Sequence, residues 1–217
     1  MNGEIFLAYL WEAPRLFWSL TVIVVFSICC HEYMHARVAL FEGDSTAADR
    51  GHLTLNPLRQ MGVWSLITFA LLGIAWGQVP VNPGVMRRRH SHALVAFAGP
   101  LTNLALFLGF GILCVLAVRL RPEQSFAAEM LFYGSTVNLL LFLLNMLPIP
   151  GFDGWAILAD FLPRVKRIQS EWVRGTFFVV VMLLFINFKW IMLFCFFAAE
   201  SWGNAFNDLL TLAGWSM

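Results

Sequence analysis

The sequence predicts an all-α, multi-pass membrane protein, and composition and apolar patterning both support this fold class. Of the 217 residues, 59% are hydrophobic and only 12% are charged, whereas a soluble domain carries roughly 25% charged residues. Several apolar runs approach the roughly 20 residues that a membrane-spanning helix needs. No linker, repeat or low-complexity run divides the chain, so we expect residues 1–217 to form a single membrane-embedded domain.

Five apolar segments define the expected architecture. Full spans are predicted at residues 17–40, 93–118 and 130–147, and a shorter apolar segment lies at 63–76. A fifth segment, 176–199, is interrupted by Asn187 and Lys189, which leaves open whether it is one span or a broken pair. After Glu200 the apolar residues recur at helical spacing, which suits an interfacial helix. We therefore expect a core at about 17–160, followed by C-terminal membrane helices at about 172–217.

Charge, cysteines and the N-terminus narrow the functional classes. The net charge is only +1, which argues against a nucleic-acid partner. The four cysteines lie in apolar runs without paired spacing, so buried, reduced thiols are expected. The first residues lack the basic start and cleavage site of a signal peptide, so the first span is expected to remain as an anchor.

The chemistry of the chain is indicated by His31-Glu32-Tyr33-Met34-His35 in the first apolar segment. Residues four apart on a helix share a face, so His31 and His35 can reach one metal ion while Glu32 acts as general base on a water. Ionisable groups at membrane depth are costly and usually functional. The alternative is a helix end at the headgroups, where these side chains are simply hydrated.

A third metal ligand is expected, because catalytic zinc usually takes three protein ligands. The best candidate is Asp153, which follows a long apolar segment in a stretch broken by Pro148, Pro150 and two glycines. Broken backbone at membrane depth is tolerated where it is buried in protein or lines a wet cavity. Alternatively, Asp153 caps a helix that begins near Trp155.

This ligand set imposes a topology. Asp153 can join His31 and His35 only if segments 17–40 and 130–147 run parallel, with an odd number of full spans between them. Because 93–118 is one such span, segment 63–76 must be re-entrant, and its shortness fits that requirement.

The basic residues favour the same topology. Ten of the 14 lysines and arginines then lie on one side and four on the other. The ten are Arg37, Arg50, Arg59, Arg87, Arg88, Arg89, Arg164, Lys166, Arg167 and Arg174, and the four are Arg15, Arg119, Arg121 and Lys189. The positive-inside tendency makes the richer side cytoplasmic, with the N-terminus outside and the metal site toward the cytoplasm.

Five motifs in order resemble the site-2 protease family of intramembrane zinc metalloproteases. They are HEYMH at His31–His35, GHLTLNP at Gly51–Pro57, WGQVPVNP at Trp76–Pro83, AGPLTN at Ala98–Asn103 and NMLPIPGFDG at Asn145–Gly154. The resemblance covers about Ser27 to Leu158. It implies a three-helix catalytic core in which His31, His35 and Asp153 bind one Zn²⁺ per chain.

The resemblance also assigns roles to other residues. Glu32 would activate the water, and the amide of Asn145 would steady the substrate carbonyl or the developing oxyanion. Asn103 would support the site, with a hydrogen bond between helices as an equal alternative. Residues His52–Asn56 resemble the family's short β-hairpin, and HLTL has strand character by itself. The other histidines, His52, His90 and His92, are expected to be polar loop residues.

The implied function is cleavage of transmembrane protein substrates in or near the lipid bilayer, in a bacterial cytoplasmic membrane. The chain resembles a minimal form without a PDZ or CBS domain, so regulation would come from elsewhere, such as a membrane partner. Departures at Leu58–Gly62, at Gly151-Phe152 and at Trp155 bear on substrate preference rather than on the zinc site. Two alternatives are a membrane metal carrier and a catalytically silent member that binds membrane helices.

Overall fold

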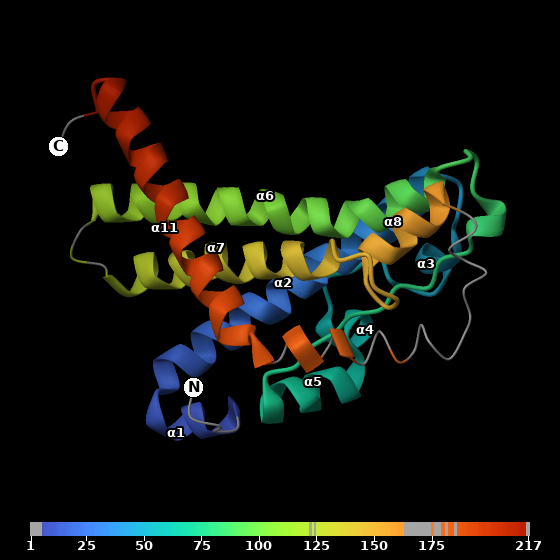
Figure 1. Cartoon of the computed structure of the whole chain (residues 1–217), viewed down its shortest axis with the longest axis horizontal. Helices are drawn as coiled ribbons and strands as arrows, with labels where there is room; N and C mark the ends of the chain where they lie inside the picture. The colour runs from blue at the N-terminus through green and yellow to red at the C-terminus, as the bar shows by residue number, and fades with distance from the viewer. Residues whose placement is uncertain are drawn as a thin grey trace.

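The computed structural model describes residues 6–121, 123, 125–162, 175, 179–180, 182–184 and 186–215, and these residues form helices and loops without β-strands (Figure 1). The long helices are α2 (Pro14–Phe41), α6 (Ser91–Leu120), α7 (Ser125–Asn145) and α11 (Phe188–Leu212). The short elements are η1 (Phe6–Ala8), α1 (Tyr9–Glu12), α3 (Thr46–Asp49), α4 (Pro57–Gln60), α5 (Gly62–Leu72), η2 (Pro83–Val85) and α8 (Asp153–Phe161).

Helices α2, α6 and α7 form the core of the molecule. They are the three described helices that are long and apolar enough to cross a membrane, and they coincide closely with the spans predicted at 17–40, 93–118 and 130–147. Helices α2 and α7 run in the same direction and α6 runs in the opposite direction (Figure 1). The C-terminal ends of α2 and α7 therefore lie at the same end of the bundle as the start of α6.

Small residues let α6, α7 and α11 approach closely. A Cβ atom on Gly134 of α7 would lie 2.9 Å from the Phe110 ring of α6, and one on Gly111 would lie 2.4 Å from the Trp202 ring of α11. Small residues at helix contacts are typical of membrane bundles, where packing drives association. Phe107 and Cys195 belong to the buried cluster that joins the three helices.

The chain reverses sharply after α7, and this turn places α8 beside the start of α6 (Figure 1). Gly151 has a φ of +99°, a conformation that favours glycine. A Cβ atom on Gly154 would lie 2.4 Å from the carbonyl oxygen of Met146, so this position also needs glycine. The His90 Nδ1 lies 2.8 Å from Asp160 Oδ2, which holds α8 against the N-terminus of α6. Asp153, the first residue of α8, is thereby turned back toward α2.

Within the predicted apolar segment 63–76, the structure contains the short helix α5, Gly62–Leu72. Its 11 residues extend about 16 Å at 1.5 Å per residue, which is too short for a hydrocarbon core of about 30 Å. The sequence-based expectation that this segment does not cross the membrane agrees with that length.

The predicted short β-hairpin around His52–Asn56 is wrong, because residues 6–121 contain no strand. The buried Gln60 side chain donates hydrogen bonds to the carbonyls of His52 and Thr54. The side chain of Asn56 accepts a hydrogen bond from Leu58 N and caps α4. These groups are satisfied locally, so the segment needs no strand partner.

Helix α11 corrects the prediction for the C-terminal region. It begins directly after Asn187, where the sequence predicted an interruption, but it continues without a break past Ala199 to Leu212. No separate interfacial helix begins at Glu200. Arg119 at the end of α6 donates hydrogen bonds to the side chain and the carbonyl of Asn207, which fix the last turns of α11. Residues 163–174, at the start of the predicted C-terminal segments, lie outside the described residues.

Candidate metal centre

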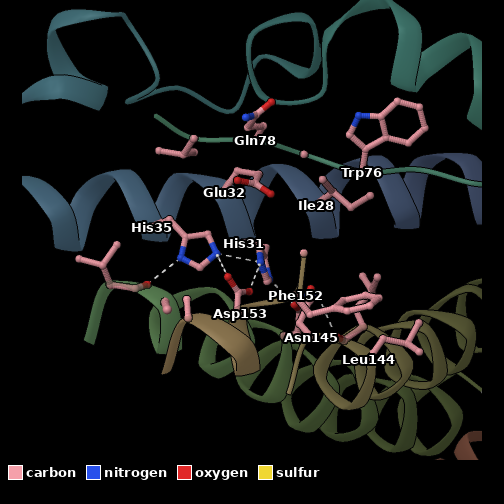
Figure 2. Close-up of a pocket in the computed structure, with 18 of the residues that line it drawn as sticks. Ile28, His31, Glu32, His35, Trp76, Gln78, Leu144, Asn145, Phe152 and Asp153 are labelled. Atoms are coloured by element: carbon pink, nitrogen blue, oxygen red, sulfur yellow. Dashed lines mark hydrogen bonds and ion pairs between the residues drawn. The ribbon is translucent and has the colours of Figure 1, made fainter. Parts of the chain in front are cut away.

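Helix α2 presents His31, Glu32 and His35 close to its C-terminal end. The two imidazoles are one helical turn apart, and their Nε2 atoms are 2.9 Å from each other. All three side chains are buried, with exposures of 6%, 7% and 7%. Figure 2 shows both imidazoles on the side of α2 that faces Asp153.

Asp153 completes the group from a position more than 100 residues later in the chain. Its Oδ2 lies 3.1 Å from His31 Nε2, and its Oδ1 lies 3.3 Å from His35 Nε2 (Figure 2). Burial raises the pKa of Asp153, but its contacts with His31 and His35 outweigh burial and lower the pKa to about 2.

The three side chains fit a metal cation. His35 Nδ1 lies 2.7 Å from the carbonyl oxygen of Val95. A carbonyl only accepts, so Nδ1 carries a proton, and in the neutral imidazole Nε2 presents its lone pair. Nε2 faces the Asp153 carboxylate, and two acceptors at this distance repel each other unless a proton or a metal cation lies between them. The ligand atoms of His31, His35 and Asp153 lie within 4.8 Å of one another, and two imidazoles with one carboxylate suit catalytic zinc.

Gly99 of α6 provides the space for the two imidazoles. A Cβ atom at this position would lie 2.4 Å from His35 Nε2 and 2.5 Å from His31 Nε2. The sequence placed Gly99 in a motif but gave no sign that it touches the ligand pair. Any larger side chain would occupy the place of the metal-facing nitrogens.

Glu32 faces a different neighbour, the loop segment 76–82. A Cβ atom on Gly77 would lie 2.4 Å from Glu32 Oε1, so the backbone of this segment passes directly over the carboxylate. Figure 2 shows Gln78 and Trp76 on this side of α2, opposite Asp153. A cavity of about 350 Å³ connects the two sides and is lined by the metal group, Glu32, Asn145 and apolar residues that include Ile28, Val79, Leu144 and Phe152.

Two buried carboxylates after α2 fix the segment 76–90 around this cavity. Asp44 is fully buried and accepts hydrogen bonds from the backbone amides of Asn82, at 2.6 Å, and Thr46, at 2.9 Å. Glu42 accepts a hydrogen bond of 2.5 Å from the Ser91 hydroxyl. The loop over Glu32 is thus tied to the end of the helix that carries Glu32.

The asparagines predicted near the site both lie there. Asn145 lines the cavity, and its Nδ2 donates to the carbonyl of Leu141, which leaves its second N–H for another acceptor. Asn103 Oδ1 lies 2.6 Å from His31 Nδ1, and Asn103 Nδ2 donates to Asn138 of α7. Asn103 therefore both supports a histidine and joins helices, so the two sequence-based alternatives coexist. Asn138 was not predicted, since no motif contains it.

The remaining histidines lie outside the ligand group. His52 lies in the loop before α4, and His90 directly precedes α6. His92 differs from the prediction, because it lies within α6 rather than in a loop and lines the cavity wall.

Comparisons with known proteins agree on one activity. A Bacillus subtilis (strain 168) protein named "Putative zinc metalloprotease YwhC" is 34% identical over 182 residues, covering 77% of this chain and 80% of the relative. The Rip2 protein of Mycolicibacterium smegmatis, named in the same way, is 36% identical over 173 residues, covering 73% of this chain and 63% of the relative. A Methanocaldococcus jannaschii protein with the same type of name, MJ0611, is 31% identical over 59% of this chain and 62% of the relative. No family model matches the chain, and no solved structure matches it.

Proposed function

Because this chain belongs to the zinc metalloprotease family of its Bacillus subtilis relative, we propose that it hydrolyses peptide bonds in or near the transmembrane helices of other membrane proteins. The chain is a zinc-dependent peptidase by this membership, and its described part contains three helices fit to cross a membrane. We propose in addition that the chain is a site-2 protease, a membership that the five sequence motifs support. The observation that carries the proposal is the position of His31, Glu32 and His35 inside a membrane-length helix.

The zinc ligands in this proposal are His31, His35 and Asp153, which hold one ion between α2 and α8. When bound there, zinc supplies Lewis acidity, which polarises a carbonyl and lowers the pKa of a water toward neutrality. The described part of the chain offers this one group of three ligand side chains.

Glu32 is the general base of the proposed reaction. Its carboxylate takes a proton from the water that adds to the scissile carbonyl, and it returns that proton to the amine when the C–N bond breaks. The free N–H of Asn145 is available to the oxygen that gains charge on the same carbonyl, a type of contact worth about 3 kcal/mol of barrier. The apolar cavity wall holds the substrate and limits access of bulk water.

A transmembrane substrate has to unwind before it can react. Inside a helix each peptide carbonyl is hydrogen-bonded four residues along the chain, and the surrounding turns exclude a nucleophile. Segments with helix-weakening residues such as Gly, Pro or Asn near the cut are therefore the expected substrates.

The proposed orientation puts the N-terminus outside and the metal group toward the cytoplasm. The sequence-based topology assigns ten of the 14 basic residues to the side that holds the ends of α2 and α7, which agrees with the positive-inside tendency. A bacterial cytoplasmic membrane is the proposed location, and a regulatory partner in that membrane is the proposed source of control.

The test of this function is Glu32→Gln, which preserves the size of the side chain beneath Gly77 but removes the base. Cleavage of a co-expressed membrane substrate should fall by about 10²–10⁴-fold, while the zinc content of the purified protein stays near one per chain. An exposed acidic residue, Asp49, provides the control, and Asp49→Asn should cleave normally. Cleavage by Glu32→Gln at the wild-type rate would exclude the mechanism.

A further inference from the structure

We propose that Asn138 and Asn103 are positioning residues that set the tautomer of His31 through a hydrogen-bond relay that starts at the backbone carbonyl of Gly134. Both amide side chains are fully buried. The inference rests on the proposed zinc site and identifies residues that fix the tautomer of one of its ligands, His31.

The polarity of the relay is fixed at its start. Asn138 Nδ2 lies 2.8 Å from the carbonyl oxygen of Gly134. A carbonyl oxygen only accepts hydrogen bonds, so the atom facing it must be the NH₂ group of the amide. The oxygen of the Asn138 amide must then face the other way, toward Asn103.

The same reasoning carries the polarity across to α6. Asn138 Oδ1 only accepts, so Asn103 turns its own NH₂ toward it, at 3.0 Å. The Asn103 oxygen is left facing His31, with 2.6 Å between Oδ1 and Nδ1. An amide oxygen cannot donate, and His31 Nδ1 therefore carries the proton.

The consequence for the metal group is that the neutral His31 imidazole carries its lone pair on Nε2. That lone pair points at Asp153 and His35, where a cation would bind. His35 reaches the same state more directly, because its Nδ1 donates to the carbonyl of Val95. One ligand thus takes its tautomer from a nearby backbone carbonyl, and the other takes it through two amides.

The relay also returns to α2. Asn138 Nδ2 donates to the Ser27 hydroxyl at 2.8 Å, and Ser27 lies one helical turn before His31. The chain of hydrogen bonds therefore includes α7, α6 and α2, the three helices of the core. A flipped amide at either asparagine would leave buried donors and acceptors mismatched, which is costly in a buried network.

The variant that isolates the relay is Asn138→Leu, because Asn138 is bonded to Asn103 rather than to His31. Loss of its oxygen frees the Asn103 amide to rotate and weakens the preference for the productive tautomer. The dissociation constant for zinc, measured by competition with a chelator on the purified protein in detergent, should rise about tenfold, as for other partners of metal-binding histidines.

A matched control lies nearby on the same helix. Ser135 is also fully buried and donates a hydrogen bond from α7 to the Phe107 carbonyl of α6, but it is not part of the relay. Ser135→Ala should lower the thermal unfolding midpoint and leave the zinc dissociation constant unchanged. An unchanged constant in Asn138→Leu, or an equal rise in both variants, would overturn the inference.

A second measurement needs no change in the relay. Nitrogen NMR of histidine-labelled wild-type protein, with the His31 signals assigned from a His31→Gln sample, reports which ring nitrogen carries the proton. The proton should be on Nδ1 with zinc bound and should remain there after zinc is removed by a chelator. A proton mainly on Nε2 in the zinc-free protein would contradict the relay.

These outcomes separate the relay from the proposed function. Wild-type protein that binds no zinc through His31 would disprove the zinc site itself. Wild-type protein that binds zinc there, with the same affinity in Asn138→Leu, would disprove the relay alone.

Discussion

At the scale of single residues, Gly99 controls whether the two imidazoles can converge. Gly99→Ala would put a methyl group 2.4–2.5 Å from both Nε2 atoms. Because Gly99 lies within α6, the imidazoles are expected to move rather than the helix backbone. Zinc affinity should fall by at least about tenfold, measured as metal retained after equilibration with a chelator.

The control for this change is on the same helix. A Cβ atom on Gly109 would meet nothing within 4 Å, so Gly109→Ala should bind zinc as wild type does and be slightly more stable, since alanine favours helix. Full zinc affinity in Gly99→Ala would show that the imidazoles do not depend on this space.

The sequence predicted the chemically distinctive residues of the site but not the small ones around them. The spacing of His31, Glu32 and His35 places them close together on one helix. Asp153 lies where prolines and glycines interrupt the apolar segment, and such an interruption can expose a metal ligand. Gly99 has no functional group, so the sequence alone could not predict its contact with the two imidazoles. Asn138 lies in an apolar run, and only the packing of α7 on α6 shows that its amide faces Asn103.

At the scale of elements, Asp44 anchors the loop segment that covers Glu32. Burial raises the pKa of Asp44, but hydrogen bonds from Asn82 and Thr46 outweigh burial and lower the pKa below its ordinary value. A lowered carboxyl pKa stabilises the folded protein above pH about 4, the ordinary value for aspartate, and this stabilisation is lost as pH falls further.

The variant Asp44→Asn should therefore be less stable than wild type at pH 7, by about 2 kcal/mol for hydrogen bonds to a charged group. The difference between their thermal unfolding midpoints in detergent should narrow as the pH falls below about 4. Asp49→Asn, at an exposed carboxylate five residues later at the end of α3, should have the same midpoint as wild type at every pH. A deficit for Asp44→Asn that is independent of pH would argue against an ionised Asp44.

The three membrane-length helices could be predicted from the sequence, whereas the conformation of His52–Asn56 and the full extent of α11 could not. The length of the apolar segments is enough to predict α2, α6 and α7, because a helix needs about 20 apolar residues to cross the hydrocarbon core of a membrane. The strand-like pattern at His52–Leu55 did not show that the Gln60 side chain donates hydrogen bonds to the backbone carbonyls of this segment. Beyond Ala199, α11 is held by the packing of Trp202 against Gly111 and by hydrogen bonds from Arg119. These contacts join segments that are distant in the sequence, so they could not be predicted from local patterns.

At the scale of the whole molecule, the parallel course of α2 and α7 predicts which loops share a side of the membrane. Gly84 belongs to the loop between α5 and α6, part of which lines the cavity of the metal group. Glu123 belongs to the connection between α6 and α7, which lies at the opposite end of these helices (Figure 1). Both positions are exposed.

In intact bacterial cells, Glu123→Cys should react with a membrane-impermeant maleimide, and Gly84→Cys should react only in inverted membrane vesicles. The parent chain supplies the background, because its four cysteines lie within helices. Labelling of both variants from one side would contradict the proposed course of the chain.

The separation of the ligand residues along the chain sets the time at which the metal can be taken up. Two ligands are synthesised by residue 35, but the third follows only at residue 153, after α6 and α7 have been made. A nascent chain that ends at the proline-rich turn contains both imidazoles but lacks Asp153. For the proposed zinc site, metal uptake is therefore expected late in biogenesis, and a ribosome-stalled chain shorter than 153 residues would not bind the metal there.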